Sequence, residues 1–159
     1  TELIRDIPFA VEKCHEDVFW SYQAIGRAGR VAVFDRPCYF YQQRSSSIMG
    51  ASYSLKRLDA LEAKVERVEY IRKYMPNLLS LAKRDLWFSC IYARQMLLRY
   101  GTPAENQQGS QLIDIALKTY PIQVQNAGVK DLKQFVWLLA AKCSLCATAR
   151  LRNALGIGF

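Results

Sequence analysis

The feature that most constrains the fold is a helical repeat of apolar side chains over residues 54–75. In the stretch SLKRLDALEAKVERVEYIRKYM, apolar residues return every three or four positions, and charged residues occupy the other faces. That spacing is the period of an amphipathic α-helix that buries one stripe. The sequence therefore predicts a helix with one side facing a core. The stripe consists of Leu58, Leu61, Val65, Val68 and Met75.

Helical signals continue to the end of the chain. Pro76 and Gly101 bracket a second periodic segment, and helices favour proline in the first turn and glycine just past the end. Residues 102–121 and 131–156 predict a third and a fourth helix. We therefore expect a tail of four helices in this part of the chain.

The first fifty residues have a different pattern. HEDVFWSYQAIGRAG, residues 15–29, predicts a helix with one buried face. RVAVFD and CYFYQQ, residues 30–35 and 38–43, predict two short strands. Two strands are too few for an independent sheet, so they form either a hairpin packed on helices or the end of a larger sheet. The predicted fold class is mainly α, with a short β element before the helical tail. The face expected to be buried on the first helix carries Phe19, Tyr22 and Ile25.

The charge is unevenly distributed. The chain has a net charge of +8, yet residues 1–50 carry six basic and six acidic side chains, whereas residues 121–159 carry five basic and one acidic. A basic balance suits nucleic acid, an anionic membrane surface or phosphorylated substrates. Basic and acidic residues are interleaved and no nucleic-acid-binding motif is present, so we expect no nucleic acid partner. Residues 130–154 mix lysine and arginine with large apolar residues. That mixture suits equally a helix on an anionic membrane surface and one packed on the bundle.

The cysteines and the apolar runs bear on location. Five cysteines, an odd number without scaffold spacing, fit a reducing compartment. Cys143 and Cys146 form a lone C-x-x-C without a second ligand pair, so we interpret them as core residues on the stripe of Leu132, Val136 and Leu139. No apolar run approaches the roughly 20 residues of a membrane span. We expect a cytoplasmic protein, with peripheral contact to the inner face of the membrane as the alternative.

Two segments carry candidate chemistry. His15, Glu16 and Asp17 open the first helix. A carboxylate there could act as a general base, but acids in a first turn also simply stabilise the helix dipole. Arg44 and Ser47 belong to a serine-rich stretch that could hold a phosphate through the guanidinium or be a solvated loop. No metal-binding or nucleotide-binding motif is present in the chain.

The order of these features resembles a known family. Residues 15–19 read H-E-D-V-F, residues 39–48 read Y-F-Y-Q-Q-R-S-S-S-I, and residues 56–61 read K-R-L-D-A-L. This arrangement is similar to the C-terminal part of bacterial family 2 glycosyltransferases with the GT-A fold, over about residues 1–75. Many of those enzymes read (H/G)-E-D-x-x-F, a helix, a strand, Y-x-Y-x-x-R-x-x-S-I, then K-R-x-D-A-L on a helix.

The resemblance implies a role for each candidate. Asp17 would be the catalytic base that deprotonates an acceptor hydroxyl, with Glu16 and His15 supporting the acceptor. Arg44 and Ser47 would lie near the diphosphate of a nucleotide-sugar donor.

The resemblance also implies a division of the chain. Residues 1–50 would be the acceptor-side end of a GT-A catalytic domain, and residues 51–159 a helical subdomain. The nucleotide-binding half with its D-x-D metal ligands would precede Thr1. The full-length parent would then use Mn²⁺ or Mg²⁺, and this fragment would bind no metal and be inactive alone. The alternative is a helical interaction module that docks on anionic membranes.

Overall fold

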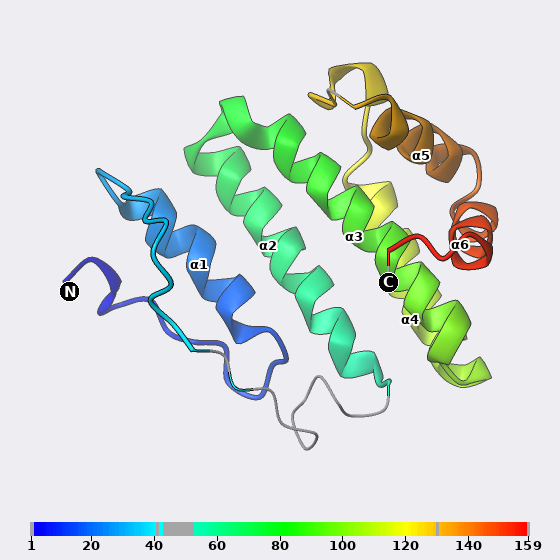
Figure 1. The fold of residues 1–159 in the computed structure, drawn as a ribbon, viewed down its shortest axis with the longest axis horizontal. Helices are drawn as coiled ribbons and strands as arrows, with labels where there is room; N and C mark the ends of the chain where they lie inside the picture. The colour runs from blue at the N-terminus through cyan, green and yellow to red at the C-terminus, as the bar shows by residue number, and fades with distance from the viewer. Residues whose placement is uncertain (1, 41, 43–52, 130, 159) are drawn as a thin grey trace.

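The computed structural model describes residues 2–40, 42, 53–129 and 131–158, and the α-helices in them form a layered bundle (Figure 1). α1 lies beside α2, α2 beside α3, and α4 and α6 pack against α3. The α-helices are α1 (Glu16–Arg27), α2 (Asp59–Tyr74), α3 (Leu79–Tyr100), α4 (Pro103–Thr119), α5 (Leu132–Cys143) and α6 (Leu145–Ala154). Short 3₁₀ turns are η1 (Glu2–Ile4), η3 (Leu55–Leu58), η4 (Pro76–Leu78) and η5 (Val124–Asn126). The prediction of a mainly helical protein is confirmed.

Local sequence signals account for the helix boundaries. Met75 ends α2, and Pro76 opens the 3₁₀ turn that leads into α3. The Thr102 hydroxyl accepts a hydrogen bond from the Glu105 amide, and the Glu105 carboxylate accepts one from the Thr102 amide. This capping box satisfies two amides that the first turn of α4 would otherwise leave unpaired.

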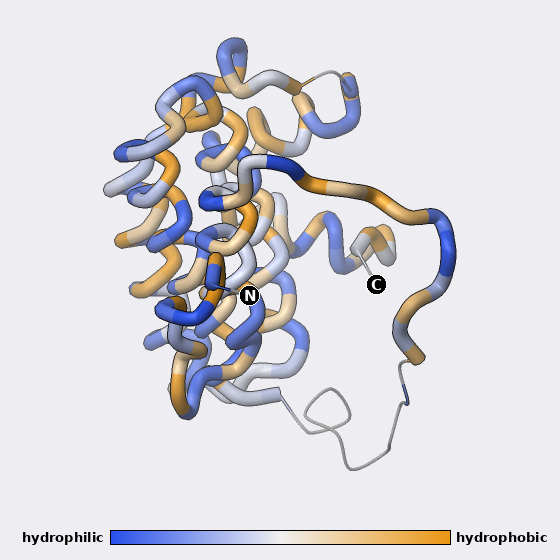
Figure 2. The backbone as a smooth tube through the Cα atoms, turned by 90° about the vertical axis from the view of Figure 1, so that its left-hand side faces the viewer, coloured by the Kyte–Doolittle hydropathy of each residue, from blue (hydrophilic) through white to orange (hydrophobic). Residues whose placement is uncertain are grey.

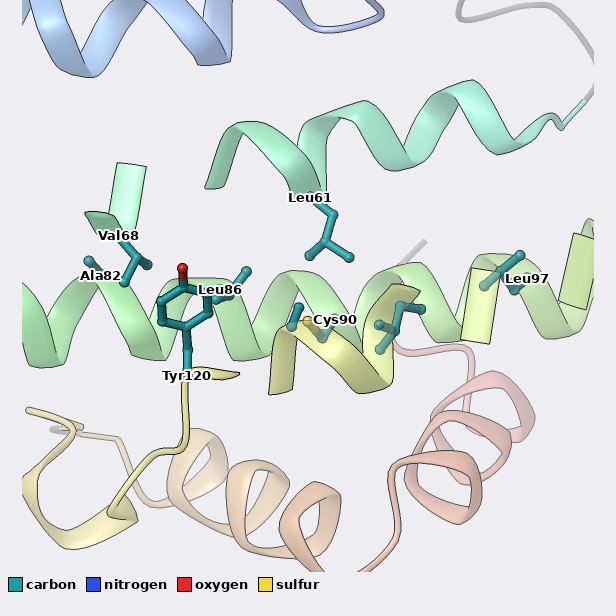
Figure 3. Packing of buried hydrophobic residues seen from close by; sticks show 9 residues of the cluster. Leu61, Val68, Ala82, Leu86, Cys90, Leu97 and Tyr120 are labelled. Atoms are coloured by element: carbon teal, nitrogen blue, oxygen red, sulfur yellow. The ribbon is translucent and has the colours of Figure 1, made fainter. Parts of the chain in front are cut away.

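The core lies where α2, α3 and α4 meet. Figure 3 shows Leu61 of α2 pointing toward α3 between Leu86 and Cys90, with Val68 and Tyr120 near one end of the cluster and Leu97 near the other. The stripe predicted from the sequence is the face of α2 that enters this core, since Leu61 and Val68 are buried. A second cluster, around Trp87 and Leu138, joins α3 to α5.

The predicted fourth helix is in fact two helices. Ser144 has an extended backbone (φ −157°, ψ 104°) between α5 and α6. Its hydroxyl accepts a hydrogen bond from the amide of Ala147, which caps α6. A serine can offer the backbone this alternative to a continuous helix. Where four helices were expected, the described part of the tail therefore contains five α-helices, α2 to α6.

The buried face of α5 was also predicted wrongly. Leu132, Val136 and Leu139 are exposed by 76%, 51% and 47%, and Cys143 is exposed as well. Leu138 and Ala141, on another side of the helix, are buried instead. The interpretation of Cys143 as a core residue is therefore wrong, whereas Cys146 is half-buried.

The predicted β-hairpin is not seen among the described residues. Residues 30–40 contain no strand, and Figure 2 shows this segment arching away from the helices. Its apolar side chains are exposed, among them Val33 at 89% and Phe40 at 88%. β-branched and aromatic residues favour strands only where another strand and a packing face are available. The described part of this chain offers neither to this segment.

Candidate functional site

The H-E-D motif forms the start of α1. His15 is the residue before the helix and adopts a left-handed backbone conformation (φ 61°, ψ 42°). Its carbonyl accepts a hydrogen bond from the amide of Val18, but its side chain makes no capping hydrogen bond. Glu16 and Asp17 occupy the first turn and are exposed. Their carboxylates are therefore accessible to a molecule from solution, and the positive end of the helix dipole favours negative charge there.

Asp59, the acid of the K-R-L-D-A-L segment, holds the loop before this motif. The Asp59 carboxylate accepts a hydrogen bond from the Cys14 amide at 2.9 Å. Lys13 Nζ lies 3.6 Å from the same carboxylate and 2.7 Å from Glu62. The start of α2 thus fixes the residues that lead into His15.

The aromatic run after the acidic pair fastens α1 to its surroundings. Phe19 is buried, and Trp20 stacks on Phe9 with ring centroids 5.3 Å apart. Tyr22 meets Tyr70 of α2 edge to face at 5.2 Å. Each such aromatic pair stabilises a fold by roughly 0.5–1.5 kcal/mol beyond its buried area. α1 is therefore held as a rigid support for the acids at its start.

The buried face of α1 only partly matches the sequence prediction. Phe19 is buried as expected and Tyr22 is half-buried. Ile25 was expected to be buried but is 61% exposed, and the neighbouring Ala24 is buried instead. One turn after Tyr22, α1 is thus already turning its apolar face partly to solvent.

His15 lines a cavity of about 340 Å³ between α2 and α3. Apolar and aromatic side chains form most of its wall, and the basic residues Arg57 and Lys64 also line it. Cavities of this size can accommodate a small molecule. Through His15, the H-E-D motif therefore borders a candidate binding site.

An ion-pair cluster sits beside this cavity. Lys64 Nζ lies 2.5 Å from the Asp85 carboxylate, which also pairs with Arg67. Burial raises the pKa of Asp85, but the two cations lower it further, so the net shift is downward. Lys64 is thereby held in one position at the cavity wall.

The remaining candidate residues concern the diphosphate and a metal. Arg44 and Ser47 lie outside the described residues. Within the described ranges, no group of three or more His, Cys, Asp or Glu side chains could hold a metal ion. The part of the chain that the structure describes therefore offers no cluster of this kind for Mn²⁺ or Mg²⁺.

Sequence reasoning missed several residues around the motif. Arg57 and Asp59 could have been selected from the sequence, because both belong to the K-R-L-D-A-L segment that contributes to the resemblance. Tyr53 and Lys64 could not, since only the packing of α2 against α3 brings them to the same cavity as His15.

Within the described part of the chain, no helix is both long and apolar enough to span a bilayer. Comparison with protein-family models, curated proteins and solved structures finds no match to this chain.

Proposed function

We propose that this chain is the acceptor-side, C-terminal part of an inverting glycosyltransferase resembling family 2 enzymes of the GT-A fold. The observation that carries the proposal is the link between two of the motif segments. Asp59 of K-R-L-D-A-L binds the Cys14 amide immediately before His15. Segments 45 residues apart in sequence thus form one structural unit, as a shared role in one site requires.

The extended segment gives further support. Residues 30–40 are rich in valine and aromatic residues, yet their apolar side chains are exposed within the described structure. Contiguous exposed apolar surface indicates a missing partner. The sheet of a nucleotide-binding half is the partner that this proposal supplies.

The proposed step uses the Asp17 carboxylate as a general base. It takes the proton of an acceptor hydroxyl while that oxygen attacks the anomeric carbon of the donor sugar. The bond from that carbon to the nucleotide diphosphate breaks, the diphosphate leaves, and the configuration inverts. Glu16 and His15 would contact the acceptor, and Arg44 with Ser47 would contact the diphosphate. A divalent metal in the parent would stabilise the charge of the leaving diphosphate.

The test is Asp17→Asn in the protein encoded by the complete reading frame. We expect the rate of sugar transfer to fall by about 10²–10⁴-fold, the usual contribution of a general base. Asp6→Asn is the control. It removes only an exposed ion pair with Arg27, which lies on α1, the helix that carries Asp17. Full activity of Asp17→Asn would refute the proposal, as would a reading frame without a nucleotide-binding half or sugar transfer by these 159 residues alone.

A second candidate is a module that docks on anionic membrane surfaces, with or without the enzyme. Leu132, Val136 and Leu139 form an exposed apolar stripe on α5. Residues 131–158 carry four basic side chains and one acidic. An apolar stripe flanked by cations is the pattern of a helix that lies in a membrane interface.

Vesicle co-sedimentation tests this second candidate. We expect binding to phosphatidylcholine vesicles only when phosphatidylserine is included, and loss of that binding in Leu139→Glu. Leu112→Glu is the matched control, because Leu112 is also 47% exposed but lies on α4. Equal loss in both variants, or binding that does not need phosphatidylserine, would exclude docking through α5.

A further inference from the structure

The cavity between α2 and α3 has the walls of a site for an apolar body. Phe88, Tyr92 and Met96 of α3 line it together with Leu58, the last residue of η3, and Leu61 in the first turn of α2. Its volume of about 340 Å³ lies in the range of small-molecule sites, which are mostly apolar with a few polar groups. The residues between which a ligand would lie therefore come from two helices that the core already holds in place.

A buried hydroxyl without a partner adds a polar feature. Tyr53 lines the cavity, and its hydroxyl is buried without a hydrogen-bond partner among the described residues. A buried polar group left unpaired costs about 1–3 kcal/mol. Burial also raises the pKa of Tyr53 to about 12, so the hydroxyl keeps its proton and can donate it to an oxygen of a ligand.

The charged side chains of the cavity wall are basic. Arg57 and Lys64 line it together with His15, and none of the described lining residues is acidic. Asp85 offsets part of the charge, because it pairs with both Lys64 and Arg67. The cluster of these three side chains nevertheless carries one net positive charge, and Arg57 is a further basic residue of the cavity wall.

The neighbouring groove on the other side of α2 has the opposite charge. It lies between α2 and α4, and its charged lining residues are Asp59, Glu62 and Glu66. The two depressions have similar apolar floors but would select ligands of opposite sign. The cationic lining therefore distinguishes the α2–α3 cavity from a mere gap between helices.

We propose that the α2–α3 cavity binds a phosphate monoester with an apolar body, the phosphate at Arg57 and Lys64 and the body against Phe88 and Tyr92. Guanidinium groups bind phosphate through paired, charge-assisted hydrogen bonds. The cavity and the H-E-D motif share His15, but the binding itself does not depend on the proposed function.

Calorimetric titration of the 159-residue chain with n-octyl phosphate tests the proposal. We expect saturable binding at one site, and binding weaker by about tenfold or more for 1-octanol, which lacks the charge. Inorganic phosphate, which lacks the body, should bind more weakly as well. Phenyl phosphate distinguishes a soluble aromatic ligand from an alkyl, lipid-like one. The proposal would be overturned if neither monoester bound saturably, or if 1-octanol bound as tightly as n-octyl phosphate.

Two variants locate the binding. Arg57→Gln should weaken binding of the phosphate by about tenfold or more, the loss of one charge-assisted hydrogen bond. Ala60→Trp should block the cavity without removing a charge, because Ala60 lines it. Arg72→Gln is the control, since Arg72 is exposed in the last turn of α2. Unchanged affinity in both Arg57→Gln and Ala60→Trp would refute the cavity as the site.

The outcome separates this inference from the proposed function. Binding that persists while Asp17→Asn leaves sugar transfer intact would refute the catalytic role and leave the cavity standing. Transfer that depends on Asp17 in a protein that binds no phosphate monoester would refute the cavity alone.

Discussion

Replacement of Asp59 tests whether α2 holds the loop before the H-E-D motif, through Lys13 and Cys14, as the structure indicates. Asp59→Ala removes the acceptor of the Cys14 amide, one partner of Lys13 and an acid in the first turn of α2. The loop would lose its polar attachment while the apolar anchors of α1 remained. We therefore expect a destabilised, more open loop rather than an unfolded chain.

The contacts give the magnitude. A hydrogen bond to a charged group contributes about 1.5–3 kcal/mol. Lys13 lies 3.6 Å from the Asp59 carboxylate and is partly exposed, so solvent screens this ion pair and it adds little. An acid in the first turn contributes about 0.3–1 kcal/mol. We expect Asp59→Ala to lower the free energy of unfolding by about 2–4 kcal/mol, and Asp59→Asn, which keeps an acceptor oxygen, by about 1 kcal/mol.

Urea unfolding followed by circular dichroism measures the loss, and hydrogen exchange at the Cys14 amide locates it. Glu62→Gln is the control, because Glu62 lies closer to Lys13, at 2.7 Å, but is 49% exposed. Exposed pairs contribute little, so Glu62→Gln should cost less than about 1 kcal/mol. A cost as large as that of Asp59→Ala, or an unchanged exchange rate at Cys14 in Asp59→Ala, would refute the reasoning.

Three further predictions follow from burial and charge. Leu138→Ala should destabilise the chain by about 2–5 kcal/mol in urea unfolding, because Leu138 is fully buried. Leu139→Ala, on the exposed face of α5, should change the free energy of unfolding by less than about 0.5 kcal/mol. Similar costs for the two variants would mean that the buried face of α5 is assigned wrongly. Burial raises the pKa of the Cys90 thiol to about 12, so a disulfide reagent at mildly alkaline pH should modify the exposed Cys143 in the native chain and Cys90 only after unfolding, as mass spectrometry of peptides can show. The pKa of Asp85 is lower in the folded chain than its ordinary value near 4, so its contribution to stability is present above about pH 4 and is lost as the pH falls through the folded value; Asp85→Asn should therefore flatten the acid side of the stability profile, and an unaltered slope would contradict this.

The helices could be predicted because their apolar residues repeat with one period. On α2 the stripe through Leu61 and Val68 is narrow, so this buried face was readable from the sequence, whereas the burial of Ala63 outside the stripe was not. On α5 apolar residues surround much of the helix, from Phe135 to Leu139. Periodicity then gives a helix but no unique face. The partners of α5 in the fold decide that Leu138 is buried and Leu139 is not.

Two predictions failed: the two strands and the single continuous last helix. The first depends on contacts with distant parts of the chain, and the second on a local hydrogen bond. The β propensity of residues 30–35 measures how well side chains suit a pleated surface, and the described chain supplies no such surface. Ser144 breaks the last helix through a local hydrogen bond to the amide of Ala147. Serine is common inside helices as well, so its presence alone does not predict a break.

The candidate site depends on contacts between the two regions that the sequence suggested. His15, Glu16 and Asp17 could be selected from the sequence because acids open an aromatic helix. Their setting could not, because Asp59 and the cavity wall come from α2 and α3, which lie later in the chain. A carboxylate becomes an effective base only when its position relative to the substrate is fixed. If Asp17 acts as proposed, the helical region is therefore part of the catalytic apparatus, since it fixes the loop before the base and forms the cavity beside it.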